Sequence, residues 1–119
     1  MNIEQLINNV KKRPGMYVGC LELQSIVHFI NGFMFNNVIS NKLDIVDKEF
    51  KDKFHDWARE QLEKKYNIEF KENRGYFYYI TQVNQNPEEG LKIFFDLCDE
   101  FFEEFHKKAA SESNIGNGV

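Results

Sequence analysis

The most regular pattern in the sequence lies at residues 86–105, which read NPEEGLKIFFDLCDEFFEEF. Asn86 is a preferred N-cap residue, Pro87 suits the first helical position, and carboxylates in the first turn favour the helix dipole. Apolar side chains then recur at helical spacing on one face: Leu91, Phe94, Phe95, Cys98, Phe101, Phe102 and Phe105. This pattern predicts an amphipathic helix that packs its phenylalanine face against other helices.

Helical spacing also marks residues 2–12, 23–38 and 47–66, with Asp47 as the predicted N-cap of the last of these helices. The helix at 23–38 is apolar on most sides and is the candidate for the central core helix. Gly32 inside it costs about 1 kcal/mol relative to alanine, so either a neighbouring helix packs closely there or the helix kinks, and we favour close packing. The large side chains expected to be mostly buried are Phe29, Phe33, Trp57, Phe94 and Phe101.

Residues 67–75 form a polar connector, and residues 76–83 (YFYYITQV) are ambiguous. Their aromatic and β-branched content suits a strand, whereas Tyr76, Tyr79, Ile80 and Val83 fit helical spacing. We favour a helix, because no second convincing strand exists to pair with this one. The predicted fold is a mainly α, compact single-domain bundle of four to five helices over residues 1–110. The alternative is an α+β fold with a short strand pair near residues 68–83, and residues 111–119 are expected to be a flexible tail.

Composition fits one domain, since 119 residues with 42% hydrophobic content and 12 Phe can build one core. The chain starts without a signal-peptide pattern and has no apolar run long enough to span a membrane, which favours a cytoplasmic protein. Cys20 and Cys98 are far apart and lie beside or within apolar helical patterns. Buried thiols are therefore expected rather than a disulfide or a zinc site.

Catalytic chemistry has little support in the sequence. Asp52, His55 and Asp56 share one helical face and could bind a metal or act as acid and base, but a solvated flank with ordinary ion pairs is the expected interpretation. His28 and His106 have no partner at ligand spacing, and no serine or cysteine lies in a nucleophile motif. We therefore predict no enzyme activity and no cofactor.

Negative charge is concentrated in the last predicted helix. Residues 86–106 carry seven carboxylates and one lysine, whereas the net charge of the whole chain is −4. Such a surface repels nucleic acid and attracts a basic protein, although acidic helix faces also serve solubility alone. The residues predicted to contact a partner are Asp96, Asp99, Glu100, Glu103 and Glu104, together with Arg74 and Tyr76. Neither a membrane partner nor an oligomeric state is indicated.

The segment Arg13-Pro14-Gly15-Met16-Tyr17-Val18-Gly19 resembles the RPGMYIG motif in the ATPase domain of DNA gyrase and topoisomerase IV. In that family the next helix carries a catalytic Glu and a magnesium-binding Asn, which here fall on Phe29 and Phe33. A phenylalanine can neither polarise water nor bind a metal. The resemblance therefore implies a structural loop or a docking element rather than an ATPase. The residues of this clasp are Arg13, Pro14, Gly15, Met16, Tyr17 and Gly19.

A second resemblance combines this loop with Phe54-His55-Asp56-Trp57, Arg74-Gly75-Tyr76 and the acidic segment Phe94–Phe101. The combination is similar to small bacterial proteins, some of which belong to the immunity proteins of polymorphic toxin systems. It implies a non-enzymatic cytoplasmic inhibitor that binds a basic toxin or effector. The alternatives are a regulatory domain that engages gyrase or topoisomerase machinery, and a degenerate gyrase-like ATP-binding fragment.

Overall fold

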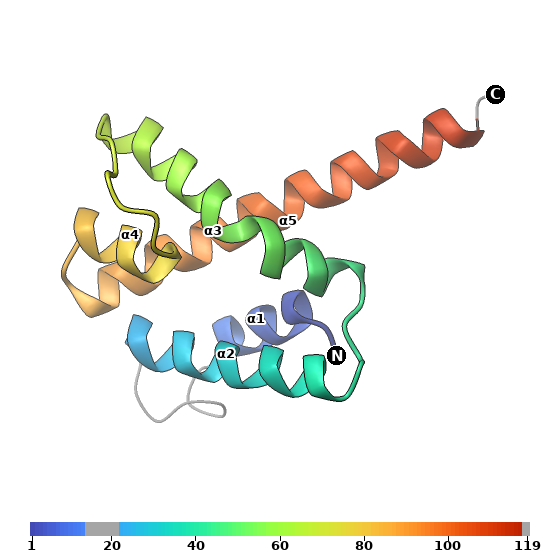
Figure 1. Ribbon diagram of the computed structural model, residues 1–119, viewed down its shortest axis with the longest axis horizontal. Coiled ribbons are helices and arrows are strands. Elements are labelled where there is room, and N and C mark those ends of the chain that lie inside the picture. The colour runs from blue at the N-terminus through green and yellow to red at the C-terminus, as the bar shows by residue number, and fades with distance from the viewer. Residues whose placement is uncertain (14–21, 118–119) are drawn as a thin grey trace.

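The computed structural model describes residues 1–13 and 22–117, which form five α-helices and no strand (Figure 1). The helices are α1 (Ile3–Lys12), α2 (Leu23–Ile39), α3 (Ile45–Tyr66), α4 (Tyr76–Val83) and α5 (Pro87–Asn117). The predicted mainly α bundle is confirmed. Residues 76–83 are helical, so the alternative with a strand in this region is wrong. Helical spacing decides this segment, because it places Tyr76, Tyr79 and Ile80 together on the buried side of α4.

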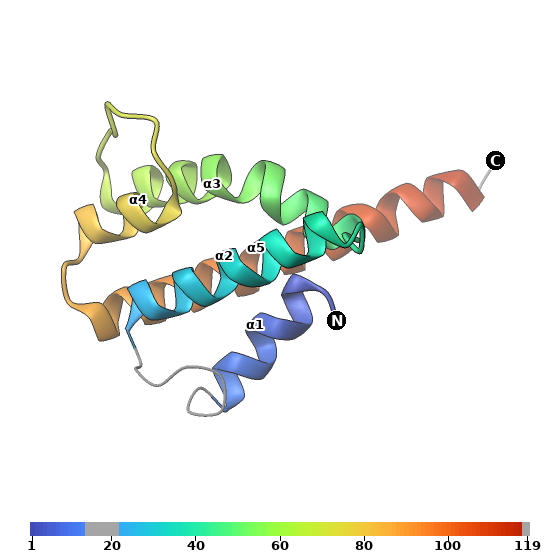
Figure 2. The same cartoon turned by 60° about the horizontal axis from the view of Figure 1, so that its bottom comes forward.

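Helix α5 contacts each of the other four helices. In Figure 1, α3 crosses α5, α1 and α2 lie below α5, and α4 packs at the end where α5 begins. The last turns of α5 extend beyond the other helices (Figures 1 and 2), and residues 111–117, predicted as a tail, continue this helix. Within the described ranges, none of the helices combines the length and the apolar character that a membrane span requires.

The start of α5 follows the sequence prediction. Asn86 Oδ1 accepts hydrogen bonds from the backbone N–H groups of Glu88 and Glu89, both at 3.0 Å. These bonds satisfy two of the donors that a helix N-terminus leaves without partners, so Asn86 caps the helix and Pro87 opens it.

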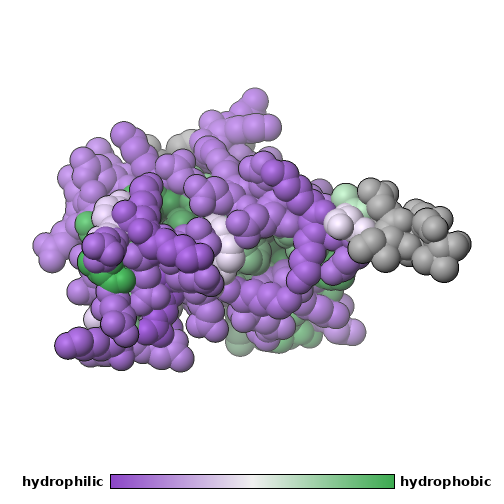
Figure 3. Space-filling view, turned by 90° about the horizontal axis from the view of Figure 1, so that it is seen from above, coloured by the Kyte–Doolittle hydropathy of each residue, from purple (hydrophilic) through white to green (hydrophobic). Residues whose placement is uncertain are grey.

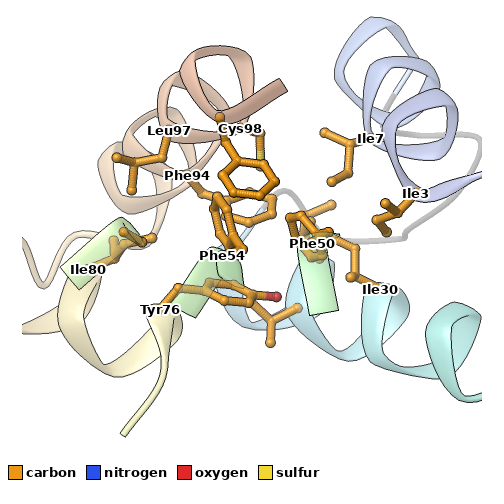
Figure 4. Packing of buried hydrophobic residues seen from close by; sticks show 14 of the residues in the cluster. Ile3, Ile7, Ile30, Phe50, Phe54, Tyr76, Ile80, Phe94, Leu97 and Cys98 are labelled. Atoms are coloured by element: carbon orange, nitrogen blue, oxygen red, sulfur yellow. The ribbon is translucent and has the colours of Figure 1, made fainter. Parts of the chain in front are cut away.

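Aromatic side chains from α3, α4 and α5 meet in the core (Figure 4). Phe54 and Phe94 are fully buried, with ring centroids 6.1 Å apart and planes nearly perpendicular. Phe50 stacks on Phe54 at 4.5 Å, and Tyr76 stacks on Phe94 at 5.2 Å. Such pairs contribute about 0.5–1.5 kcal/mol each beyond the area they bury. The core therefore joins three helices through contacts between rings.

Burial of the five predicted core residues is only partly as expected. Phe94 and Phe101 are buried, whereas Phe29, Phe33 and Trp57 are half-buried at the margin of the core. The expectation of close packing at Gly32 is also wrong, because a Cβ built there would meet nothing within 4 Å. For Phe29, Phe33 and Gly32 the physical reason is that α2 lies at the edge of the bundle (Figure 1), so that one face packs inward and the other faces solvent. Trp57 is on α3, where it lines a surface hollow beside α5.

The N-termini of α1 and α3 share one set of capping hydrogen bonds. Asn2 caps α1 and Asp44 caps α3, and the Asn2 Nδ2 donates to Asp44 Oδ2 at 3.0 Å. Asp47 is fully buried, and its carboxylate accepts the backbone N–H of Ile3 at 2.6 Å and that of Asp44 at 3.1 Å. The prediction of Asp47 as N-cap is therefore wrong by one turn, since the helix begins earlier and Asp47 lies inside it.

Hydrogen bonds around Asp44 favour its ionised form. Burial by itself would raise the pKa of this carboxyl, but hydrogen bonds from the backbone of Asp47 and the side chain of Asn2 outweigh it and lower the pKa. Folding lowers the pKa of Asp44, so ionised Asp44 stabilises the folded state at pH values above the usual carboxyl pKa. This contribution to the free energy of unfolding is lost as the pH falls through the lowered pKa of the folded state.

The connector between α3 and α4 is held against α3 through Phe70. Glu63 Oε2 accepts the Phe70 N–H at 2.9 Å, and Arg59 donates to the Phe70 carbonyl oxygen. The Phe70 ring is buried against Tyr79, with centroids 4.8 Å apart. Both backbone polar groups of Phe70 are thus satisfied while its side chain enters the core.

Replacing Asp47 tests the shared cap. Asp47→Ala leaves the buried N–H of Ile3 without its acceptor and removes the reciprocal bond to Asp44, so we expect a loss of about 2–4 kcal/mol of unfolding free energy. Asp52→Ala, on the exposed side of the same helix, should change stability by less than about 0.5 kcal/mol. Urea denaturation of both variants measures the difference. Equal stabilities would show that the buried carboxylate does not hold α1 to α3.

Candidate protein-binding surface

All five carboxylates predicted on α5 are exposed, and they follow the side of the helix that the core leaves open. They do not share the same surroundings. Asp99 forms an ion pair with Lys11 of α1, and Glu104 accepts a hydrogen bond from Trp57 Nε1 of α3 at 2.8 Å. Glu103 pairs with Lys107 one turn later at 3.0 Å. Within the described part of the chain, Asp96 and Glu100 form no ion pair, so their charges are the least compensated.

Two hollows lie along the line where α3 meets α5. The larger, of about 160 Å³, has an apolar floor of Trp57, Phe101 and Phe105 and a charged rim of Glu49, Lys53, Glu104 and Lys108. The smaller, of about 80 Å³, is bordered by Asp96 and Glu100 on α5 and by Lys65 on α3. Figure 3, which views the molecule from above, shows mostly hydrophilic side chains with hydrophobic ones visible between them. We call these hollows and the five carboxylates the α3–α5 surface.

Arg74 and Tyr76 are not part of the α3–α5 surface, because neither lines its two hollows. Arg74 is exposed on the connector, where it pairs with Glu72 at 2.8 Å and lies 5.2 Å from the centroid of the Tyr78 ring. Tyr76 is only 3% exposed and packs in the core. The prediction that Tyr76 contacts a partner is therefore not supported, since the apolar face of α4 turns its ring inward.

Of the predicted clasp, only Arg13 lies within the described residues. Its N–H donates to the Asn9 carbonyl oxygen at 3.0 Å and closes α1, so the helix ends before the proline as the sequence predicts. The other clasp residues, Pro14, Gly15, Met16, Tyr17 and Gly19, lie outside the described residues.

A third hollow, of about 330 Å³, brings together residues that are distant in sequence. Its polar lining includes His28 of α2 and His55 of α3, two residues that sequence spacing leaves unrelated. The backbone N–H of Tyr76 donates to His55 Nδ1 at 3.1 Å, and the two rings stack at 5.0 Å. A Cβ at Gly75 would lie 3.1 Å from His55 Nδ1, so a side chain there would require the imidazole to shift by a few tenths of an ångström. His55 therefore orients the start of α4.

The candidate metal or acid–base cluster at Asp52, His55 and Asp56 has ordinary surroundings. Asp52 lies 3.9 Å from Lys51, which is one of the ion pairs expected for a solvated flank. Burial lowers the pKa of His55, against the smaller opposing effect of Asp56. Among the described residues, no three His, Cys, Asp or Glu side chains are grouped so that they could hold a metal ion.

In comparisons with known proteins, neither a family model, nor a curated protein, nor a solved structure matches this chain.

The lowered pKa of His55 predicts a pH dependence. The unfolded state binds a proton near the ordinary pKa of about 6.5, while the folded state resists protonation, so stability should fall as the pH drops from 7 towards 5. His55→Gln removes this titration and should flatten that part of the profile. Denaturation series at several pH values measure both proteins. If the free energy of unfolding changed with pH equally in the parent and in His55→Gln, the pH dependence would belong to other groups.

The hydroxyl of Tyr76 provides a second test. It is buried without a hydrogen-bond partner among the described residues, and burial raises the pKa of the phenol well above its usual range. Tyr76→Phe removes a desolvated polar group, so the variant should be as stable as the parent or more stable by up to about 1 kcal/mol.

Tyr79→Phe is the matched control. The Tyr79 hydroxyl accepts the Arg74 N–H at 2.8 Å and donates to Asn73 Oδ1 at 3.3 Å, so its removal should cost about 1 kcal/mol. Thermal unfolding compares the two variants directly. A larger loss for Tyr76→Phe than for Tyr79→Phe would contradict the assignment of the hydrogen bonds.

Proposed function

We propose that this chain is a non-enzymatic binding protein of the immunity type, which neutralises a basic bacterial toxin or effector by covering it with the α3–α5 surface. The observation that carries the proposal is the combination, on one side of the molecule, of five exposed carboxylates with a hollow whose floor is aromatic. The resemblance in the sequence to immunity proteins supports the same function and a cytoplasmic location.

The carboxylates suit attraction of a cationic partner. Like charges in a row along about two helical turns sum to a local potential that raises the rate of encounter with a basic surface. Single exposed ion pairs contribute only about 0–1 kcal/mol, so the effect belongs to the group rather than to one residue. Asp96 and Glu100 contribute most in this account, because Asp99 and Glu103 are already paired with Lys11 and Lys107.

The larger hollow suits an anchoring side chain from the partner. Aromatic residues and arginine dominate the binding energy of protein interfaces, and they act through desolvated pockets surrounded by a polar rim. Trp57 and Phe105 are half-buried, so each retains apolar area that a partner can cover. The rim is balanced in charge, because Glu49 is paired with Lys53 at 3.1 Å and Glu104 lies with Lys108, so the apolar floor favours an aromatic anchor.

Several groups with potential for catalysis have structural roles, which supports a binding protein over an enzyme. His55 accepts a hydrogen bond from the backbone of Tyr76, and His106 of α5 contacts the Glu4 carboxylate of α1 at 2.8 Å. Cys98 is fully buried, and burial raises the pKa of its thiol well above the usual value. A thiol in this environment is a poor nucleophile.

The structure indicates which charges can be reversed without disturbing the fold. Among the described residues, Asp96, Glu100 and Glu103 form no ion pair with another helix, whereas Asp99 bonds to Lys11 of α1 and Glu104 to Trp57 of α3. The triple variant Asp96→Lys, Glu100→Lys, Glu103→Lys should therefore fold normally. It should bind the partner at least about tenfold more weakly at low salt, mainly through a slower association rate.

The matched control reverses Asp52, Asp56 and Glu60, three exposed carboxylates on α3 outside the lining of both hollows. This control variant changes the net charge of the chain by the same amount as the α5 triple variant, but outside the α3–α5 surface. The partner is the protein that co-purifies with the chain from its native cell, and surface plasmon resonance at two salt concentrations measures both variants. Expression of that partner should arrest growth, and co-expression of the parent chain should restore it. Equal binding by both variants, or a partner without toxicity, would refute the proposal.

A further inference from the structure

Large apolar side chains are exposed at the end of α2. Phe35 and Ile39 are each 67% exposed and Val38 is 45% exposed, and their spacing places them on one side of the helix. Ile45, at the start of α3, and Met1 are exposed to 68% and 67%. We call these five residues the α2 corner. The α3–α5 surface does not include any of them.

Hydrogen bonds bring these five residues to one place. The Lys42 N–H donates to the Asn37 carbonyl oxygen at 2.9 Å, which turns the chain back after α2 and leads into Ile45. The bond from Asn2 to Asp44 holds Met1 beside the start of α3. Figures 1 and 2 both place the N-terminus, the end of α2 and the start of α3 at the same corner of the molecule.

The apolar area of the α2 corner is large for a monomer. Phe35 is a large aromatic residue and the other four are smaller aliphatic ones, so with exposed fractions of 45% to 68% the five present on the order of 500 Å² together. This is at the upper end of the apolar patches found on monomeric proteins. Two such patches facing each other would remove about 1,000 Å² from water, which is where specific interfaces begin.

The absence of charged residues on α2 favours a second copy of this chain as the partner that covers the α2 corner. None of the 17 residues Leu23–Ile39 is Asp, Glu, Lys or Arg. In a twofold contact a residue close to the symmetry axis faces its own copy, so a charge at that position would face a like charge. An uncharged helix avoids this repulsion, and it also gives a basic partner nothing to pair with. We propose that the α2 corner is the interface of a homodimer in which α2 packs against α2 of a second copy.

This proposal is independent of the proposed function. In Figure 1, α2 lies at the bottom of the molecule. None of the five residues of the α2 corner lines either hollow of the α3–α5 surface. A dimer through the α2 corner therefore uses no residue of the α3–α5 surface, and one assembly would carry two binding surfaces.

Sedimentation equilibrium of the purified chain tests the proposal. The mass should rise from one chain to two over roughly the micromolar to millimolar range. Phe35→Glu with Ile39→Glu puts charges at the centre of the interface and should weaken association by about 100-fold or more. Val38→Lys is a milder variant, at a less exposed position, that should act in the same direction. Circular dichroism confirms the fold of each variant.

Ile68→Glu is the control, because Ile68 is 42% exposed on the connector away from α2, and this variant should associate like the parent. An apolar interface should hold or tighten as salt is added, whereas binding at the α3–α5 surface should weaken. A mass of one chain at every concentration would overturn the proposal. Dimerisation that persists in all the α2 variants would also overturn it. The same holds for dimerisation that added salt weakens and that the variant Asp96→Lys, Glu100→Lys, Glu103→Lys abolishes.

Discussion

Burial of the phenylalanine face of α5 is the interaction on which the other helices depend. Phe94 and Cys98 are fully buried and Phe101 is nearly so, and α5 is in contact with each of the other four helices. A short helix such as α4, with eight residues, is not stable in water by itself and requires packing to form. Its rings meet those of α5 and α3 through Tyr76, which links the three helices.

Polar constraints then fix how the helices enter this core. The buried carboxylate of Asp47 satisfies backbone donors from two different helices, so α1 and α3 cannot separate without exposing them. At the other end of α3, Glu63 and Arg59 bind the backbone of Phe70. Helix α3 is thus attached at both ends to segments that lie far from each other in sequence, and its middle faces α5. The hollow lined by Trp57, Phe101 and Phe105 is a consequence of this placement.

The proposed binding surface also results from the packing of α5. An amphipathic helix that buries one face must turn its other face to solvent, and in α5 that face carries carboxylates. Packing divides these carboxylates into two groups. Asp99, Glu103 and Glu104 are used within the molecule, by Lys11, Lys107 and Trp57, and Asp96 and Glu100 are left without ionic partners among the described residues. The surface offered to a partner is therefore smaller than the acidic sequence pattern suggests.

The sequence by itself determined the helices and, except in α2, their buried faces, because helical spacing, the Asn86 cap and the boundary before Pro14 depend on neighbouring residues only. It also determined that the α5 carboxylates are exposed. It did not determine that Tyr76 is buried, that Asp47 accepts the N–H of Ile3 in α1, or that His28 and His55 line one hollow. These features depend on which helices meet, and that choice is made by the fit of large side chains such as Phe54 and Phe94 across the core. The exposed side of α2 was decided in the same way, since a helix that is apolar all round has no pattern to show which face the other helices will cover.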